Sequence, residues 1–285
     1  NTHKEGIGDA EFRLEIEAIM AAQGRYTDAL ALIKKDNPFP AVCGRVCNKR
    51  CEEACTRATL DEAVAIDDVK RFIAQKDLDS KTRYIPKKVI PSNRGEFKNK
   101  IAIIGGGPAG LSCAYYLALT GYRPIVFEKN EKPGGMLTYG IPSYKLEKDV
   151  VEAEIDIIRA LGVEIKCGVE VGKDITLDEL RKDGYEAFYI AIGCQGSRKS
   201  GVDGEDADGV MSAVDILHEI AENHDLDLKG NKTVVIGGGN VAVDVARSTK
   251  RCGADVLGMF CLESREEMPA SEEEIFETEV IFRMC

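Results

Sequence analysis

The sequence predicts an α/β protein in which an all-α region is followed by two Rossmann-like domains. Three observations support this prediction. Residues 1 to about 80 have helical periodicity and almost no runs of β-branched residues. From Lys100 onward, short apolar runs alternate with glycine turns and amphipathic segments. The glycine spacing of the first such unit recurs 132 residues later, which indicates a domain-scale duplication.

The composition is that of an ordinary folded chain with an acidic surplus. Hydrophobic residues make up 44% of the chain and charged residues 31%, so a core of normal size can form. The 38 basic and 49 acidic side chains give a net charge of −11, which argues against nucleic acid or an anionic membrane as the main partner. Residues 101–124 carry a single charge, but three glycines and a proline interrupt them, so no membrane span is predicted.

Residues 1–12 contain charges and no apolar run, so no signal peptide is predicted. The absence of an initiator Met suggests a trimmed or excised chain. Four of the ten cysteines lie close together, at Cys43, Cys47, Cys51 and Cys55. Clustering without a secretion signal favours metal ligation in a reducing compartment over disulfides, and we therefore expect a cytoplasmic protein.

Two amphipathic helices are predicted in the N-terminal region, each from apolar residues on one helical face. The first face carries Phe12, Ile16, Ile19 and Met20, and the second carries Ala29, Leu30, Leu32 and Ile33. Between Leu78 and Lys100 the chain becomes polar and basic, with two prolines and no clear periodicity, which is typical of a linker.

The first strand, turn and helix begin with the apolar run 101–104. Pro108 suits the first turn of a helix, and Gly121 can end that helix before a second strand at 124–127.

Three further elements are predicted downstream. Apolar positions over 150–161 indicate an amphipathic helix. Thr176 with Glu179 predicts a capping box, and residues 187–192 predict a buried strand that ends at Gly193.

The first glycine turn predicts a dinucleotide site. A pyrophosphate needs close backbone approach and free N–H donors at a helix N-terminus, and glycine permits both. Gly105, Gly107 and Gly110 follow a strand and precede a helix. Glu128 lies 21 residues past Gly107 and can accept hydrogen bonds from ribose hydroxyls. The alternative is an ordinary tight turn with Glu128 merely exposed.

The second turn, Gly237, Gly239 and Ala242, has the permitted alanine at its third place and predicts a second dinucleotide. Two such sites can hold a flavin and a nicotinamide face to face, and hydride transfer between cofactors needs no protein nucleophile. No catalytic side chain is therefore predicted. Asp244 and Arg247 are candidates for orienting the nicotinamide half or a neighbouring domain, and a plain helix-surface salt bridge is equally compatible.

The four clustered cysteines are each four residues apart. Gly44 and the polar residues 48–50 indicate a segment that is partly turn and able to wrap a compact cluster. Four thiolates suit zinc or an iron–sulfur cluster, and spacing alone does not choose between them. Because paired C-x-x-C units are absent, we favour iron–sulfur.

Five segments together resemble the glutamate synthase small (β) subunit family and its relatives. These relatives include the N-terminal half of dihydropyrimidine dehydrogenase and the flavin subunit of ferredoxin-dependent transhydrogenases. The segments are NPFPAVCGRVC at 37–47, GGGPAGL at 105–111, PGGMLTYGIP at 133–142, GGGNVAVDVAR at 237–247 and REEMPAS at 265–271. The resemblance covers about Gly24 to Ser271.

The resemblance implies FAD at the first turn, NAD(P)H at the second and [4Fe–4S] clusters in a helical, ferredoxin-like N-terminal domain. Cys47, Cys51 and Cys55 match best as cluster ligands, and Cys43 matches less well because some relatives lack it. The stretch from Gly135 to Ile141 would approach the flavin, and Val169 would lie near the adenine. The residues expected to bind FAD are Gly105, Gly107, Pro108, Ala109, Gly110, Glu128, Lys129, Gly135, Met136, Leu137, Gly140, Ile141, Val169 and Gly193. Those expected to bind the nicotinamide nucleotide are Gly237, Gly239, Asn240, Val241, Ala242, Asp244 and Glu263.

The sequence departs from this family in its cluster ligands and its C-terminal part. Relatives carry another cysteine group upstream of Gly24, which is absent here, so at least one cluster is expected to be incomplete unless another segment supplies ligands. A non-cysteine ligand of some relatives falls near Lys70, which cannot coordinate, although Asp67 and Asp68 lie close by. No counterpart of the later segment that closes over the flavin precedes Cys285, so we expect a fragment with weak or absent FAD binding in isolation.

A further departure concerns the nucleotide. NADPH-using relatives carry consecutive arginines where this chain has Leu262 and Glu263. A carboxylate there would repel a 2′-phosphate and could accept from a free 2′-hydroxyl, which predicts NADH over NADPH. The alternative is a solvated glutamate in an acidic tail.

The sequence thus predicts a helical iron–sulfur domain with linker at 1–96, an FAD-binding domain lacking its C-terminal part at 97–200, and an incomplete NAD(P)H-binding domain at 201–285. The predicted function is an oxidoreductase subunit that passes electrons from NAD(P)H through FAD to a [4Fe–4S] cluster and an electron-accepting protein, of glutamate synthase large-subunit or ferredoxin type. The alternatives are a non-catalytic docking or scaffold subunit and a thioredoxin-reductase-like disulfide reductase. The second is disfavoured because no C-x-x-C or C-x₄-C pair occurs after Gly105.

Overall fold

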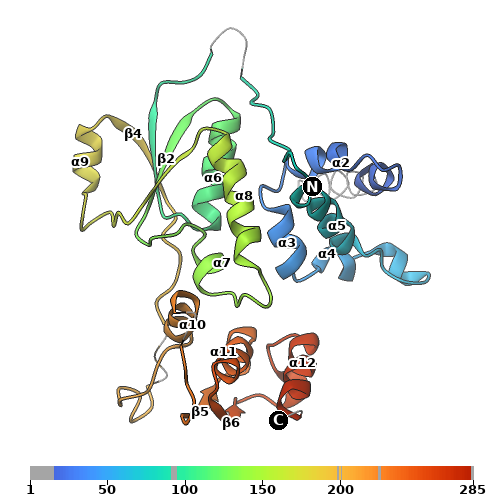
Figure 1. The fold of residues 1–285 in the computed structure, drawn as a ribbon, viewed down its shortest axis with the longest axis vertical. Helices are drawn as coiled ribbons and strands as arrows, with labels where there is room; N and C mark the ends of the chain where they lie inside the picture. Colours follow the sequence, from blue (N-terminus) through green and yellow to red (C-terminus); the bar gives the residue numbers. More distant parts are fainter. Residues whose placement is uncertain (1–15, 91–94, 198, 200, 224–225, 284–285) are drawn as a thin grey trace, which may run out of the picture. The chain divides into compact units, whose positions relative to one another are not determined.

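The computed structural model describes residues 16–90, 95–197, 199, 201–223 and 226–283 (Figure 1). The chain divides into two compact units. The first comprises the residues up to Leu137 and Lys145–Gly193, and the second comprises Thr138–Tyr144 and Cys194–Cys285. Within the described ranges, no helix has both the length and the apolar character needed to cross a membrane.

The N-terminal region is helical, as predicted. A helix over residues 16–22 precedes α2 (Tyr26–Ile33), α3 (Pro40–Val46), α4 (Arg50–Glu53), the 3₁₀ turn η1 (Thr56–Thr59) and α5 (Ile66–Leu78). The second predicted apolar face is confirmed, because Ala29, Leu30 and Ile33 are buried against Ile73 of α5. On the first predicted face, Phe12 lies outside the described residues and Ile19 is exposed.

The first unit contains a four-stranded parallel sheet. Its order is β3 (Glu164–Cys167), β2 (Arg123–Glu128), β1 (Lys100–Ile104) and β4 (Tyr185–Ile190). Helices α6 (Pro108–Leu119) and α8 (Lys148–Ala160) lie side by side along one face, α9 (Leu177–Lys182) packs against β4, and the short α7 (Met136–Tyr139) follows β2 (Figure 1). This is the strand, turn and helix alternation that the sequence predicts.

Local signals in the sequence set several helix ends of this unit. Pro108 is the first residue of α6, and Gly121, with φ +95°, follows its last turn. The predicted capping box is confirmed, because the Thr176 hydroxyl accepts from the Glu179 N–H and the Glu179 carboxylate accepts from the Thr176 N–H.

The strand predicted at 187–192 is present, but the prediction that it is buried is wrong. In β4 and just after it, Tyr189, Ile190 and Ile192 are 43%, 63% and 67% exposed. Among the described strands β4 pairs only with β1, so it is one of the two edge strands of the sheet. A short apolar run identifies a strand, whereas its place at the centre or edge depends on distant segments.

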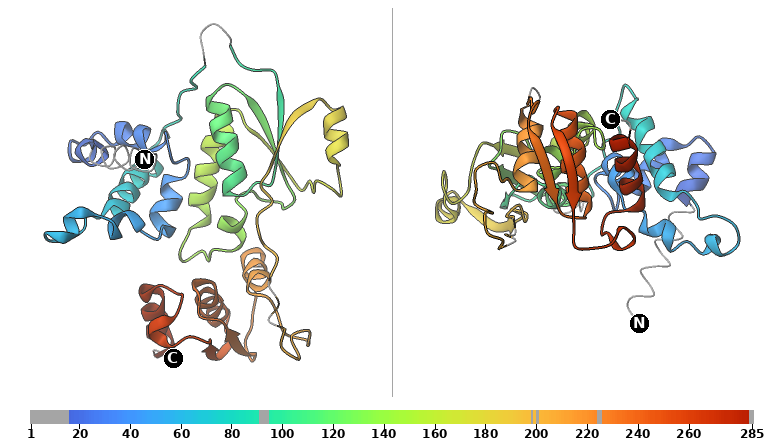
Figure 2. Two further views of the ribbon diagram at one scale, coloured as in Figure 1. Left: turned by 180° about the vertical axis from the view of Figure 1, so that it is seen from behind. Right: turned by 90° about the horizontal axis from the view of Figure 1, so that it is seen from below.

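The second unit contains α10 (Ala213–Glu222), β5 (Lys232–Ile236), α11 (Asn240–Arg251), β6 (Asp255–Phe260), the 3₁₀ turn η2 (Arg265–Glu267) and α12 (Glu272–Arg283). The two strands are parallel, and Figure 2 shows this unit from two further directions. Ile216 and Leu217 of α10 and Ala246 of α11 pack on Val235 and Val256 of the strands. The mixed α/β class is therefore confirmed.

Candidate nucleotide-binding turns and cysteine segment

The first glycine turn joins β1 to α6 and depends on very close backbone contacts. Gly105 has φ +105°, and its N–H donates to the Phe127 carbonyl at 2.8 Å. A Cβ on Gly110 would lie 2.0 Å from the Gly105 carbonyl oxygen, so only glycine lets α6 begin this close to the turn. Gly107 caps α6 without a side chain. The first N–H groups of α6 are therefore left for an external acceptor, such as a phosphate.

Glu128 at the end of β2 faces this turn. Its side chain is buried, Oε2 accepts from the Gly106 N–H at 2.6 Å, and Oε1 accepts from the Asn130 N–H at 2.9 Å. The alternative of a merely exposed Glu128 is therefore wrong. Because each carboxylate oxygen has a second lone pair, Glu128 can still accept from ribose hydroxyls.

The loop over residues 134–137 closes the first turn. The Gly134 N–H donates to the Gly106 carbonyl at 2.7 Å. Gly135 has φ +55°, and a Cβ there would lie 2.9 Å from Gly107 Cα, so the two backbones touch. Lys148 Nζ donates to the Leu137 carbonyl at 2.9 Å, and burial lowers the pKa of Lys148 to about 8. This lysine gave no signal in the sequence.

The structure brings together most residues predicted to bind FAD. The N–H of Val169 donates to the Glu128 carbonyl at 2.9 Å, and Lys129 beside it is exposed. Gly193 follows β4 and is exposed. Gly140 and Ile141 belong to the second unit, so the predicted stretch 135–141 is divided between the two units. The residues that gather at the first turn are Gly105, Gly107, Pro108, Ala109, Gly110, Glu128, Gly135, Met136 and Leu137.

The second turn repeats this backbone between β5 and α11. Gly237 has φ +138°, and its N–H donates to the Phe260 carbonyl at 2.8 Å. The Ala270 N–H donates to the Gly238 carbonyl at 3.0 Å, as Gly134 does to Gly106 in the first unit. Gly239 caps α11, and a Cβ there would meet nothing within 4 Å. The space in front of this helix start is therefore open to a ligand.

The carboxylate beside the second turn, that of Glu263, does not occupy the position in the strand that Glu128 occupies at the first turn. Strand pairing matches Ile104 with Phe127 and Ile236 with Phe260, so the residue after Phe260, Cys261, takes the place of Glu128. A Cβ on Gly238 would lie 3.0 Å from Cys261 Cβ and 3.5 Å from Glu263 Oε2. The Glu263 carboxylate therefore reaches the turn from two residues further along. Comparing the strand registers identifies Cys261, which the sequence reasoning missed.

The other predicted residues of the second site lie on α11. Asn240 Oδ1 accepts from the Ser271 N–H at 2.9 Å, and Val241 is exposed. Asp244 is buried and accepts from the Tyr144 hydroxyl at 3.3 Å. Buried Arg247 pairs with Glu274 and Glu277 of α12 at 2.8 and 2.7 Å, so it holds two helices of its own unit together.

The cysteine segment is partly turn, as predicted. Helices α3 and α4 are separated at Cys47–Lys49, where Lys49 has φ +54°. Gly44 serves packing instead of turning, since a Cβ there would lie 2.7 Å from Cβ of Arg71 on α5.

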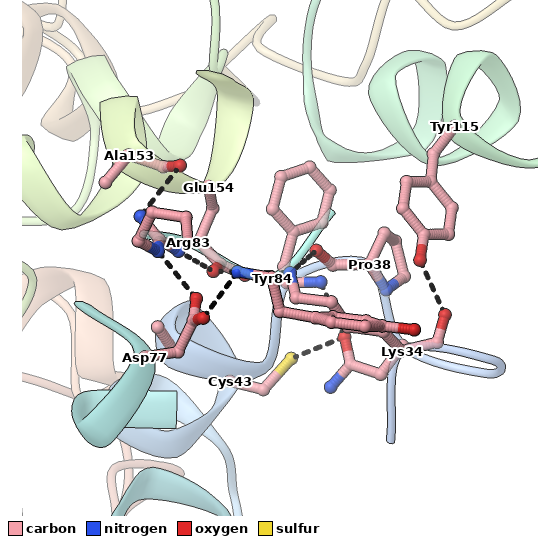
Figure 3. Close-up of polar contacts among 12 residues, drawn as sticks. Lys34, Pro38, Cys43, Asp77, Arg83, Tyr84, Tyr115, Ala153 and Glu154 are labelled. Carbon is pink, nitrogen blue, oxygen red and sulfur yellow. Dashed lines mark hydrogen bonds and ion pairs between the residues drawn. The ribbon is translucent and has the colours of Figure 1, made fainter. Parts of the chain in front are cut away.

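The four sulfurs lie in different surroundings. Cys43 donates to Asn37 Oδ1 at 3.7 Å (Figure 3), and burial raises the pKa of its thiol. Cys47 and Cys51 are exposed, and backbone N–H donors lower the pKa of Cys55. In the part of the chain that the structure describes, no three His, Cys, Asp or Glu side chains are grouped to hold a metal. The cysteines have the donor chemistry of a cluster but do not form a complete ligand set among these residues.

A buried charge network joins the helical N-terminal region to α8 (Figure 3). Lys34 Nζ lies 3.5 Å from Glu154 Oε1, and both side chains are 1% exposed. Arg83 contacts Glu154 at 3.2 Å and Asp77 at 2.6 Å. The Tyr115 hydroxyl of α6 donates to the Lys34 carbonyl at 2.7 Å. Burial lowers the pKa of Lys34 and raises that of Glu154. The network thus joins the helical region to the sheet-covering helices of the same unit.

Two glycine turns, each at a helix start with a carboxylate beside it, are the arrangement typical of dinucleotide-binding α/β proteins. A family model described as pyridine nucleotide-disulphide oxidoreductase matches residues 99–277, and the chain belongs to that family. A second family model, described as dihydropyrimidine dehydrogenase domain II with a 4Fe-4S cluster, matches residues 14–82. This second match covers all four clustered cysteines.

The resemblance to glutamate synthase small subunits is confirmed. The small chain of glutamate synthase [NADPH] from Escherichia coli is 36% identical over 90% of this chain and 56% of its own length. The beta subunit of NADP(+)-dependent formate dehydrogenase from Moorella thermoacetica is 41% identical over 93% of this chain and 40% of its own. The chain therefore spans about half the length of these relatives.

Solved structures support the fold. FprA from Mycobacterium tuberculosis in complex with NADPH superposes with a TM-score of 0.54 at 24% identity, covering 64% of this chain and 47% of that one. At this identity the likeness concerns the fold alone.

Proposed function

We propose that this chain is the electron-input part of an NAD(P)H-dependent flavin and iron–sulfur oxidoreductase. The first turn would hold FAD, the second a nicotinamide nucleotide, and electrons would leave toward an electron-accepting protein subunit. The observation that carries this proposal is the repetition of one turn geometry, with Gly105 and Gly237 both at positive φ and Gly107 and Gly239 both capping a helix. The names of the relatives, which are subunits of NADPH and NADP(+) enzymes, support it.

The residues at the first turn fit a bound FAD. Its diphosphate would lie at the start of α6, where glycine leaves room and the helix N–H groups point outward. Glu128 would orient the ribose, and the loop 134–137 would lie along the flavin. FAD, when bound, accepts a hydride and releases single electrons. The protein's part is to bind and orient, which agrees with the absence of a predicted nucleophile.

The second turn would hold the diphosphate of the nicotinamide nucleotide at the start of α11. Glu263 Oε2 lies 3.5 Å from the place of a Cβ on Gly238, close to where Glu128 lies in the first turn. A carboxylate there accepts from a 2′-hydroxyl and repels a 2′-phosphate, so we propose a preference for NADH. The relatives are named as NADPH and NADP(+) enzymes, so Glu263 is the residue on which this preference depends.

The cysteine segment would belong to an iron–sulfur domain within residues 1–96, with Rossmann-like domains at 97–200 and 201–285. The family match over 14–82 and the thiol donors support this assignment. We expect iron and acid-labile sulfide in the intact protein, purified from the cytoplasmic fraction without air. Absence of both would leave zinc as the candidate metal.

A dye-reduction assay tests the proposed function. The intact protein, supplied with FAD, is given NADH or NADPH and an artificial one-electron acceptor. We expect nucleotide-dependent reduction of the dye. No turnover with either nucleotide, in protein that retains FAD, would instead indicate a docking or scaffold subunit.

A further inference from the structure

The segment Thr138–Tyr144 leaves the first unit and packs within the second. We call it the crossing segment. Helix α7 spans Met136–Tyr139, so its first half belongs to the first unit and its second half to the second unit. The chain returns to the first unit at Lys145. One helical turn is thus continuous with both the loop that closes the first glycine turn and the crossing segment.

Tyr139 anchors the start of the crossing segment. Its side chain is 4% exposed, and its ring stacks on His218 of α10 with centroids 4.6 Å apart and planes inclined by 13°. His218 is also within 3.1 Å of Glu222, one turn further along α10. The imidazole that Tyr139 contacts is therefore itself held in place.

Tyr144 anchors the end of the crossing segment on α11. Its hydroxyl donates to Asp244 Oδ1 at 3.3 Å. Its ring centroid lies 4.8 Å from the guanidinium carbon of Arg247 and 4.0 Å from that of Arg251. Arg247 is buried and paired with α12, so the ring packs on a fixed partner. Three contacts with α11 thus hold Tyr144, which directly precedes Lys145, the residue at which the chain returns to the first unit.

The loop 134–137 is held on the other side within the first unit. The Gly134 N–H donates to Gly106, the Leu137 N–H donates to the Gly134 carbonyl at 3.1 Å, and Lys148 binds the Leu137 carbonyl. The loop is therefore hydrogen-bonded within the first unit, and the crossing segment that follows it is anchored within the second unit by Tyr139 and Tyr144.

We propose that Tyr144 is a positioning residue, which fixes the crossing segment on α11 and thereby sets the conformation of the loop 134–137. The assignment of that loop to the flavin rests on the proposed function, whereas the mechanical link between Tyr144 and the loop does not.

Hydrogen exchange in the intact protein tests the link without any cofactor. The variant Tyr144→Leu removes the hydroxyl and the ring, and Tyr144→Phe keeps the ring. Tyr189→Leu is the control, since Tyr189 is similarly exposed, at 43% against 37%, and lies on β4. We expect exchange at the Gly134 and Leu137 amides to be about tenfold faster in Tyr144→Leu, and close to wild type in Tyr144→Phe and Tyr189→Leu.

Faster exchange confined to the crossing segment, with Gly134 and Leu137 unchanged, would overturn the proposal. If Tyr144→Leu loses protection throughout α8, exchange at the Gly134 and Leu137 amides is measured in Arg251→Met, which removes one guanidinium from the ring. Unchanged exchange at these two amides in Arg251→Met would likewise overturn the proposal. In flavin-loaded protein we expect Tyr144→Leu to slow flavin reduction by the nucleotide without changing the nucleotide's Kd. Wild-type protein that binds no flavin would contradict the proposed function while leaving the exchange result to decide the role of Tyr144.

Discussion

The two units build the same turn but surround it differently. In both, the N–H of a glycine at positive φ donates to a carbonyl near the end of the neighbouring strand. A second glycine caps the helix, and a loop N–H donates to the carbonyl of the middle glycine and closes the turn. The first turn is tightly enclosed by Gly110, the buried Glu128 and the contact of Gly135 with Gly107. The second turn has Ala242, Cys261 and the exposed Glu263 in the corresponding surroundings.

This difference shows which parts of a dinucleotide turn are fixed and which are free to change. The backbone is set by glycine dihedrals and by pairing of two neighbouring strands, and it repeats. The acid and the third small residue depend on how closely the helix approaches the turn, and they vary. Specificity for one nucleotide is therefore expected to depend on the surroundings of the turn and not on its backbone.

The largest expected effect concerns the buried charges that support the first unit. Glu154→Gln leaves Lys34 buried without its counter-charge, and we expect the free energy of unfolding to fall by about 3 kcal/mol in urea denaturation. The double variant Lys34→Met with Glu154→Leu removes both charges and is expected to recover most of that loss. In the second unit, Arg247→Met breaks pairs with Glu274 and Glu277, which are 19% and 49% exposed against 1% for Glu154, so a smaller loss is expected. Equal losses in the two units would contradict this contrast.

The second effect concerns the third residue of each glycine motif, which is Gly110 in the first turn and Ala242 in the second. Gly110→Ala places a Cβ 2.0 Å from the Gly105 carbonyl oxygen, and we expect a loss of about 2 kcal/mol because the helix must move. The reciprocal change, Ala242→Gly, is expected to cost about 0.5–1 kcal/mol, which is the helix-propensity difference. Thermal and urea unfolding of both variants measure this. An unchanged free energy of unfolding in Gly110→Ala would show that α6 does not approach the turn as closely as described.

The third effect concerns the acid of the second turn. Glu263→Arg replaces a repulsive with an attractive group beside the expected 2′-phosphate, and we expect the ratio of kcat/KM for NADPH to that for NADH to rise about tenfold, or ~1.4 kcal/mol. Glu266→Arg makes the same charge change at a neighbouring exposed position and serves as the control. An equal shift in both variants would mean that general charge, and not Glu263, sets the preference.

The smallest expected effect is on how stability depends on pH. It distinguishes Lys148, which holds the loop at the first turn, from Asn240, which holds Ser271 at the second. Lys148 holds the first loop, and burial lowers its pKa from 10.5 to about 8, so between these values the unfolded chain binds a proton that the folded chain has released. The wild type is therefore expected to gain stability relative to Lys148→Met as the pH rises from 8 to 10. Asn240, which holds Ser271 at the second turn, does not titrate, so the loss in Asn240→Ala should be independent of pH. A pH-independent difference for Lys148→Met would contradict the burial of its amine.

The sequence predicts the local features well, because glycine turns, the Thr176 capping box and the face of Ala29, Leu30 and Ile33 follow from residues near one another in the chain. It does not predict the edge position of β4, the pairing of Lys34 with Glu154 or the contact of Tyr144 with α11. Each of these joins segments separated by long stretches of chain, for which periodicity and spacing contain no information. Cys261 is an intermediate case, because the repeat indicates it only after the two strand registers are aligned.

Transfer of hydride from the second turn to the flavin is tested most directly by blocking the second turn and following the redox state of the flavin. Gly239→Glu puts a side chain into open space in front of α11, where the expected diphosphate would lie, and Gly196→Glu makes the same change at another position where a Cβ meets nothing within 4 Å. Intact, flavin-loaded protein is mixed anaerobically with NADH or NADPH, and the loss of oxidised-flavin absorbance is followed. We predict rapid bleaching in the wild type and in Gly196→Glu, and bleaching slowed by at least about a hundredfold in Gly239→Glu with its flavin still bound. Equal bleaching in all three proteins would show that hydride does not reach the flavin from the second turn.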